Sequence, residues 1–223
     1  VKDKFDYDKL YKESIELPEK FWASIASYYH WYKKWDKVLN WEFDTPNVEW
    51  FLGGKTNITY NCIDRHLEYA SDQIAIIWEP NEINQESKSI TYQTLYHEVC
   101  KASNVLKQLG VEKGDRVCIY LPMIPELAYF VLACARIGAI HSIVFAGFSA
   151  QSLTDRLTDA ECKIIITADG AFRGAKAIGL KEIVDEALLT SPTVKSVIVL
   201  QHTMTSVTMV EGRDIWWHEA IAH

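Results

Sequence analysis

The stretch Arg116-Val-Cys-Ile-Tyr-Leu121 is followed by a helical pattern over residues 125–137 and then by Ala139-Ile-His-Ser-Ile-Val-Phe145, and this succession decides the fold. Each apolar run is short, and Gly138 ends the helical pattern between them. Strands buried on both faces are continuous apolar runs, and two strands joined by a helix of this length run parallel. The stretch therefore predicts a β-α-β unit of a parallel sheet.

The same alternation of short apolar runs and helical patterns continues on both sides of this unit. We expect further strands at residues 74–78, 90–92, 162–167 and 196–200, and further helices that end at Leu109, begin at Ala150 and span residues 180–189. A chain of 223 residues with 48% hydrophobic content is long enough to bury a substantial core. The predicted fold class is α/β: a βαβ array with a largely parallel sheet flanked by helices.

Residues 1–66 differ from the rest of the chain. Five of the eight tryptophans lie within residues 22–50, and no strong two-residue alternation is present. Pro18 begins an amphipathic helical pattern, and turn signals occur within residues 44–54. Aromatic residues at irregular spacing favour packing area over a ligand-stacking surface. We predict an aromatic-rich helical N-terminal extension, made of helices and loops, that packs on a main body formed by residues 67–223.

The composition argues against several classes of partner. The formal net charge is -7, the isoelectric point is near 5.5, and 23 Lys and Arg are scattered among 30 acidic residues. A nucleic-acid partner calls for a basic face or stripe, so none is expected. No apolar run is long enough to cross a membrane, and the start of the chain is charged rather than signal-like. We expect a cytoplasmic protein without a membrane contact.

The cysteines lack the spacing of a metal site or a redox motif. All five lie far apart in the sequence, mostly within apolar segments: Cys62, Cys100, Cys118, Cys134 and Cys162. They are expected to be small buried hydrophobes in a reducing compartment, and no metal site is predicted.

Two segments that follow predicted strands carry the candidate site. In an open α/β sheet, ligands bind beyond the carboxyl ends of the strands. Phe145-Ala-Gly-Phe-Ser149 offers a glycine turn, a Ser cap and bare backbone amides near the start of a helix, which suits a phosphate or an adenine-bearing ligand. Ala168-Asp-Gly-Ala-Phe-Arg-Gly-Ala-Lys176 carries two cations, Arg173 and Lys176, between small residues. From the residues alone, an ordinary turn with solvated cations stays an equal alternative.

Several further motifs occur in a fixed order along the chain. They are Trp50-Phe-Leu-Gly-Gly-Lys-Thr-Asn-Ile-Thr-Tyr-Asn-Cys-Ile-Asp-Arg-His-Leu67, Gly110-Val-Glu-Lys-Gly-Asp-Arg-Val117, Val144-Phe-Ala-Gly-Phe-Ser149 and Glu211-Gly-Arg-Asp-Ile-Trp-Trp217. Together they resemble the AMP-forming acetyl-CoA synthetases, a branch of the adenylate-forming ligase superfamily. The resemblance covers nearly the whole chain.

The resemblance implies a two-step ligase reaction in a full-length enzyme. Acetate attacks ATP, with Mg²⁺, to give acetyl-AMP and pyrophosphate, and CoA then displaces AMP to give acetyl-CoA. The resemblance also implies that Phe145, Ala146 and Gly147 lie against the CoA nucleotide, and that Arg173 and Lys176 hold its 3′-phosphate. Ala146 stands where Gly is usual, which crowds the approach of a ligand. Lys176 stands where Arg is common, which keeps the charge and gives up bidentate geometry.

The resemblance further implies that most of the reacting centre lies outside this chain. The ATP and Mg²⁺ sites are expected beyond His223, in the remainder of the same polypeptide, so no catalytic residue and no metal ligand is assigned here. We expect the isolated chain to have no ligase activity, and acetate-dependent pyrophosphate release from the purified chain would contradict this.

Two alternatives stay open: a portion of a propionyl-CoA synthetase, and a stand-alone nucleotide-binding or interaction module. A reading frame that continues past His223 favours the enzyme, and a stop codon there favours the module.

Overall fold

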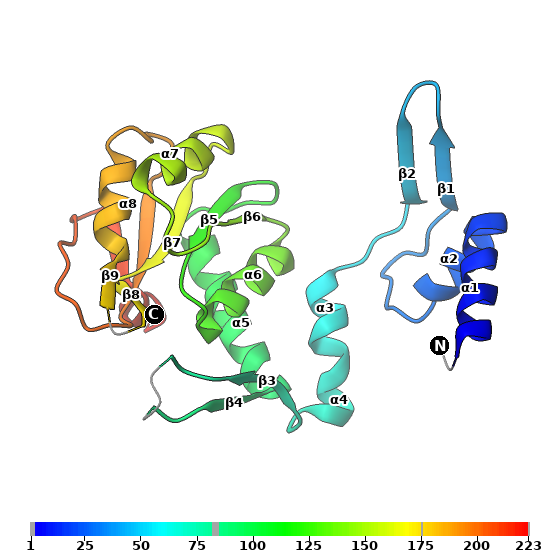
Figure 1. The fold of residues 1–223 in the computed structure, drawn as a ribbon, viewed down its shortest axis with the longest axis horizontal. Coiled ribbons are helices and arrows are strands. Elements are labelled where there is room, and N and C mark those ends of the chain that lie inside the picture. The colour runs from blue at the N-terminus through cyan, green and yellow to red at the C-terminus, as the bar shows by residue number, and fades with distance from the viewer. Residues whose placement is uncertain (1–2, 82–84, 175, 223) are drawn as a thin grey trace. The chain divides into compact units, whose positions relative to one another are not determined.

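The computed structural model describes residues 3–81, 85–174 and 176–222. Its contacts divide the chain into two compact units, Val1–Arg65 and His66–His223 (Figure 1).

Unit 1 contains helices and one β-hairpin. Its elements are α1 (Lys4–Glu16), α2 (Pro18–Ala26), β1 (Lys37–Glu42), β2 (Asn47–Leu52) and α3 (Ile58–Cys62). The Asp3 carboxylate accepts a hydrogen bond from the Asp6 amide and so caps α1, and Pro18 stands in the first turn of α2, as predicted. The two N-terminal helices agree with the sequence analysis.

The antiparallel β1–β2 hairpin was not predicted, and the description of residues 1–66 as helices and loops was incomplete. Its register places Leu39 opposite Trp50 and Trp41 opposite Val48, on one face. The apolar alternation on each strand covers only two positions, which is too short for a two-residue period to stand out among so many aromatics.

Part of the aromatic content of unit 1 is packing area, which agrees with the packing interpretation. The Trp31 ring lies 5.0 Å from the Trp35 ring and 5.3 Å from the Phe51 ring, measured between centroids. On the hairpin face, Trp22 meets Trp50 edge-on at 5.9 Å, whereas Trp41 is 60% exposed.

Unit 2 is built on a five-stranded sheet in which every neighbouring pair is parallel. The strand order is β11-β10-β7-β5-β6, with β5 (Arg116–Tyr120), β6 (Ile140–Ile143), β7 (Ile164–Ala168), β10 (Ser196–Leu200) and β11 (Asp214–Trp216). All five residues of the central strand β7 are buried, because helices cover both faces of the sheet. The predicted parallel α/β sheet is confirmed.

The helices of unit 2 pack in pairs on this sheet. They are α5 (Tyr92–Gln108), α6 (Pro125–Ile137), α7 (Ala150–Asp159), α8 (Leu180–Leu188) and α9 (Trp217–Ala220), preceded by the short η1 (Asp64–His66), which straddles the unit division, and α4 (Leu67–Ala70). Helix α5 contacts α6, and α7 contacts α8. As the pattern predicted, α6 ends at Gly138, whose backbone is left-handed.

In the described part of unit 2, two strand pairs lie outside the main sheet, and both differ from the sequence-based expectation. The runs near residues 74–78 and 90–92 are β3 (Ile74–Trp78) and β4 (Lys88–Thr91), which pair with each other antiparallel. Too few residues separate them for a parallel crossover, which takes about a dozen residues or more. Where a loop was expected after β7, the chain forms the antiparallel hairpin of β8 (Gly170–Arg173) and β9 (Lys176–Gly179).

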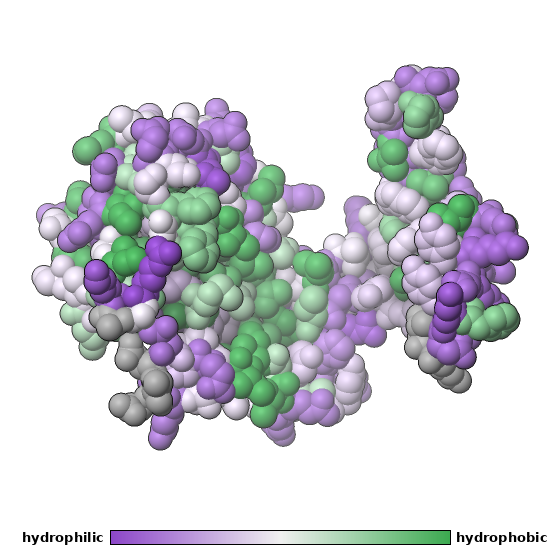
Figure 2. Space-filling view, viewed as in Figure 1, coloured by the Kyte–Doolittle hydropathy of each residue, from purple (hydrophilic) through white to green (hydrophobic). Residues whose placement is uncertain are grey.

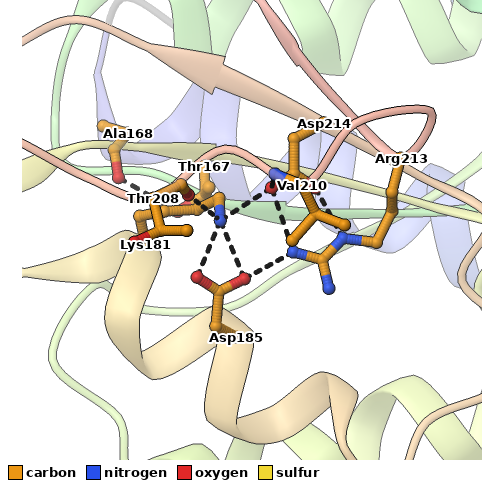
Figure 3. Close-up of polar contacts among 8 residues, drawn as sticks. All are labelled: Thr167, Ala168, Lys181, Asp185, Thr208, Val210, Arg213 and Asp214. Carbon is orange, nitrogen blue, oxygen red and sulfur yellow. Dashed lines mark hydrogen bonds and ion pairs between the residues drawn. The ribbon is translucent and has the colours of Figure 1, made fainter.

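A buried cluster of charges ties α8 to the start of β11 (Figure 3). The Lys181 ammonium lies 2.7 Å from the carboxylate of Asp185 and 2.8 Å from that of Asp214, and it donates to the Thr208 carbonyl at 2.9 Å. Arg213 bridges the same two carboxylates, at 2.6 Å from Asp185 and 2.5 Å from Asp214. The side chains of Lys181 and Asp214 are fully buried, so this pair of charges lies away from water, while Asp185 and Arg213 at the edge of the cluster are partly exposed.

Opposing effects set the pKa of Asp214. Burial alone would raise it, but hydrogen bonds from Arg213, Lys181 and the Val210 amide outweigh burial, and the pKa lies below its usual range. The hydrogen bond to Asp214 raises the pKa of Arg213. Asp214 and Arg213 are therefore both charged at neutral pH.

Candidate functional site

A cavity of about 550 Å³ opens where the chain leaves the carboxyl ends of several strands in unit 2. Its walls come from the end of β3, the segment after β5, the end of β6, the hairpin strand β8 and the segment after β10. This is the position at which α/β sheets bind their ligands. Most of the lining is apolar, and four rings contribute to it: Trp78, Phe145, Phe172 and His202. Figure 2 shows hydrophobic side chains gathered over the β3–β4 pair.

Tyr120, the last residue of β5, holds the predicted loop 145–149 through two hydrogen bonds. The Tyr120 hydroxyl donates to the Phe148 carbonyl at 2.8 Å and accepts from the Gly147 amide at 3.3 Å. Burial raises the pKa of Tyr120, so its hydroxyl remains protonated and able to donate. Gly147 has a φ of +136°, a conformation that a side chain would strain. The loop is therefore fixed in one shape.

The amides of this loop are partly used within the chain. The Gly147 amide binds Tyr120, and the Phe148 amide donates to the Phe145 carbonyl at 3.2 Å. Ser149 caps α7, as the sequence suggested, by accepting from the Ser152 amide. The expectation that the amides of this loop are bare is thus wrong at Gly147 and Phe148. What the loop presents is the Phe145 ring, which is 66% exposed.

The two predicted cations stand at the turn of the β8–β9 hairpin. Arg173 and Lys176 face each other in register, and Gly174 between them has a φ of +59°. Both side chains are exposed, and within the described ranges of the chain neither has a hydrogen bond or an ion pair. Two positive charges therefore project from this turn, and no carboxylate of the described residues pairs with them.

Only some of the predicted site residues line the cavity. Phe145 and Ala146 line the cavity, while Gly147, Arg173 and Lys176 do not. Ala171 and Phe172, on the hairpin strand that leads to Arg173, also line the cavity. The two segments therefore flank one cavity, with the cations beyond its lining.

Asp169, which the sequence analysis did not single out, organises the wall next to the hairpin. Its fully buried carboxylate accepts hydrogen bonds from four backbone amides, those of Gly170 at 2.7 Å, His202 at 2.8 Å, Thr203 at 2.9 Å and Thr205 at 3.1 Å. These bonds fix the segment after β10 beside the end of β7. The available signal was an acid placed directly after a buried apolar run.

His202 lies on the cavity wall that Asp169 orders. Its ring contacts the ring of Phe172 edge-on, with 5.6 Å between centroids. Burial lowers the pKa of His202, and the charge of Lys88 lowers it further, although Asp169 raises it. His202 is therefore neutral at neutral pH and presents an uncharged polar ring to the cavity.

The cysteines only partly follow the prediction. Cys118, Cys134 and Cys162 are buried, but Cys100 is half-buried and Cys62 is exposed. Burial raises the pKa of Cys118 and Cys162, and it raises the pKa of Cys134 to about 12, so these thiols are unreactive.

Metal-ligand clusters and membrane-spanning helices are both absent from residues 3–81, 85–174 and 176–222. Those residues contain no group of three or more His, Cys, Asp or Glu placed to hold a metal ion. None of their helices combines the length and the apolar character needed to cross a membrane.

Comparison with known proteins gives consistent matches. The family model described as AMP-binding enzyme matches residues 63–219, and the one described as acetyl-coenzyme A synthetase N-terminus matches residues 7–62. The chain is 57% identical over 217 residues to an acetyl-coenzyme A synthetase of Desulfatibacillum aliphaticivorans, and 53% identical over 217 residues to acetyl-coenzyme A synthetase 2 of Pseudomonas aeruginosa.

Each alignment covers 97% of this chain but only 33% and 34% of those relatives, respectively. Among solved structures, acetoacetyl-CoA synthetase from Streptomyces lividans matches with a TM-score of 0.86 and 26% identity, over 95% of this chain and 32% of that one. The chain thus spans about a third of the length of the relatives it matches.

Proposed function

The chain belongs to the AMP-binding enzyme family, and on this premise we propose that it is part of an acetyl-CoA synthetase to which it contributes a portion of the CoA site. The observation that carries the proposal is a pair of exposed cations, Arg173 and Lys176, next to an apolar cavity at the strand ends; neither has an ion-pair partner among the described residues. A ligand with a phosphorylated end and a long, mostly apolar arm fits such a surface. The names of the relatives support the choice of CoA.

The proposed reaction of the whole enzyme joins acetate to CoA in two steps. Acetate and ATP first give acetyl-AMP and pyrophosphate, and the CoA thiol then displaces AMP. In this reaction the described residues bind and orient CoA, with the cations placed toward its 3′-phosphate and the cavity wall toward its arm. The nucleotide part of CoA is remote from the reacting thiol. Binding energy gained at the nucleotide therefore helps to position the thiol for reaction.

ATP and Mg²⁺ belong to the proposal for the whole enzyme only. The described residues offer no cluster of metal ligands, so no Mg²⁺ site is assigned to them. Cytoplasmic location is likewise a proposal, supported by the unbonded state of the five cysteines, which is typical of a reducing compartment.

Isothermal titration of the purified chain with CoA and with dephospho-CoA tests the assignment. We expect CoA to bind about fivefold more tightly, because only CoA carries the phosphate that Arg173 and Lys176 meet. The double variant Arg173→Ala, Lys176→Ala should bind both ligands equally. Lys107→Ala, which removes an exposed cation from the end of α5, is the control and should retain the preference.

Equal affinities for the two ligands in the unaltered chain would dismiss the role of Arg173 and Lys176. Absence of CoA binding would dismiss the CoA site itself.

A further inference from the structure

The β3–β4 pair forms a wall of the cavity, although it lies outside the main sheet and outside the predicted site. Trp78, the last residue of β3, lines the cavity together with the residues that follow it. The Trp78 indole N–H donates to the Met123 carbonyl at 2.8 Å, and Met123 lines the same cavity. The indole ring is therefore held in a fixed orientation at the cavity wall.

Lys88 is held against this indole. Register pairs Lys88 on β4 with Trp78 on β3, and the Lys88 ammonium lies 5.3 Å from the centroid of the indole ring. A cation at this distance from a tryptophan face is attracted to it. Within the described part of the chain, the Lys88 ammonium has no hydrogen bond and no carboxylate partner. The ring thus fixes a positive charge without neutralising it.

This wall also meets the hairpin that carries the other two cations. The Asn81 side-chain amide donates to the Gly174 carbonyl at 3.4 Å, so the segment after β3 touches the turn between Arg173 and Lys176. The positive charge of Lys88 also contributes to the lowered pKa of His202, which lines the cavity. Lys88 itself is not a lining residue, but it is held on Trp78, which lines the cavity on the wall that touches the hairpin turn.

We propose that Lys88, held on the face of Trp78, is a further binding residue that contacts a phosphate of the ligand in this cavity. The inference rests on the proposed CoA site and adds a third cation, on a different structural element, to the two on the hairpin. A compact ammonium serves as a point charge for phosphate and needs no bidentate geometry. The indole limits the freedom of the lysine side chain, which reduces the entropy lost when a ligand binds.

Glu79, on the same wall, allows a test in which a substitution should raise the affinity for the ligand instead of lowering it. Its exposed carboxylate lines the cavity directly after Trp78. A negative charge there opposes an anionic ligand, so Glu79→Gln should tighten its binding, whereas Lys88→Met should weaken it.

The experiment titrates the chain and its variants with CoA, dephospho-CoA and pantetheine, which lacks phosphate. Lys88→Met should weaken binding of CoA about fivefold and leave pantetheine unchanged. Lys107→Met is the matched control: it removes an exposed lysine from the last turn of α5, which leads to the start of β5 and so lies at the opposite end of the strands from the cavity. It should change none of the three affinities.

Comparing CoA, dephospho-CoA and pantetheine distinguishes the possible positions of Lys88 relative to the ligand. A loss for CoA alone places Lys88 at the 3′-phosphate, and an equal loss for CoA and dephospho-CoA places it at the diphosphate; both support the proposal. Unchanged CoA affinity in Lys88→Met, or an equal loss for pantetheine, overturns it while leaving the CoA site intact. If the unaltered chain binds no CoA, the proposed function and this inference both fail.

Discussion

Lys176 and Lys181 stand on either side of residues 177–180, yet their surroundings are opposite. Lys181 is fully buried and held by two carboxylates and a carbonyl, whereas Lys176 is exposed at a hairpin turn and has no partner among the described residues. Arg213 and Arg173 repeat the contrast: Arg213 bridges Asp185 and Asp214, whereas Arg173 has no partner in the described ranges. The comparison teaches that pairing, rather than residue type, separates a cation that stabilises the fold from one that is available to a ligand.

The largest effect on stability is expected in the buried cluster. Asp214→Ala removes the carboxylate shared by Lys181 and Arg213 and should lower the free energy of unfolding by about 3–5 kcal/mol, because buried charges lose their compensation. Urea unfolding followed by circular dichroism measures it. Asp159→Ala, at an exposed position on α7, is the control and should change little. A loss below about 1 kcal/mol in Asp214→Ala would show that the cluster is not what holds α8 to β11.

A smaller loss is expected at the cavity wall. Asp169→Asn places an amide group where four backbone amides now donate to a carboxylate, and it should lower the free energy of unfolding by about 2 kcal/mol. Because the Asp169 charge raises the pKa of His202, the variant should also lower that pKa further. NMR titration of the His202 ring follows this, and an unchanged or raised pKa would contradict the contact.

Acidification should weaken the partly buried ion pair of Asp115 and Lys163. The hydrogen bond from Lys163, 2.8 Å away, lowers the pKa of Asp115 in the folded state. A lowered pKa contributes stability above the unfolded value of about 3.9, and this contribution is lost as the pH falls through the folded value.

Asp115→Asn should therefore reduce the free energy of unfolding by up to about 1 kcal/mol at pH 6, and the difference from the unaltered chain should shrink toward pH 3. Chemical unfolding at both pH values measures it. A difference that grows on acidification would reverse the assigned sign.

The smallest effect on stability is expected at the hairpin turn. Arg173→Ala and Lys176→Ala should each change the free energy of unfolding by less than about 0.5 kcal/mol, because neither side chain has a partner in the described structure. Thermal unfolding of each variant beside the unaltered chain tests this. A loss near that of Asp214→Ala would mean that these cations are structural, and the contrast with Lys181 would break down.

The parallel sheet was predictable because its strands are buried on both faces. Residues such as Ile165 and Val197 have no exposed side, so the apolar runs were continuous and the helices between them were long enough to require parallel pairing. The short hairpins were missed because β1, β2, β8 and β9 mix apolar, polar and charged residues over a few positions. Their pairing depends on turn geometry and on contacts with distant segments.

The candidate site likewise contains residues whose proximity was predictable from the sequence and residues whose proximity was not. Phe145 and Arg173 could be placed near each other from their positions after strands, since the carboxyl ends of parallel strands lie on one edge of the sheet. Trp78, Lys88 and His202 could not, because β3 and β4 leave the main sheet and the segment after β10 takes its path from hydrogen bonds to Asp169. Spatial neighbours brought together by such irregular segments carry no local sequence signal.

The position of β6 at one end of the strand order affects how the chain behaves in concentrated solution. Within the described ranges β6 pairs only with β5, and Ile140 and Ile143 on it are 55% and 50% exposed. An open strand edge with apolar side chains is a template for pairing with another polypeptide. Preparations of the isolated chain should therefore self-associate as the protein concentration rises, and a lysine introduced at Ile143 should delay that association.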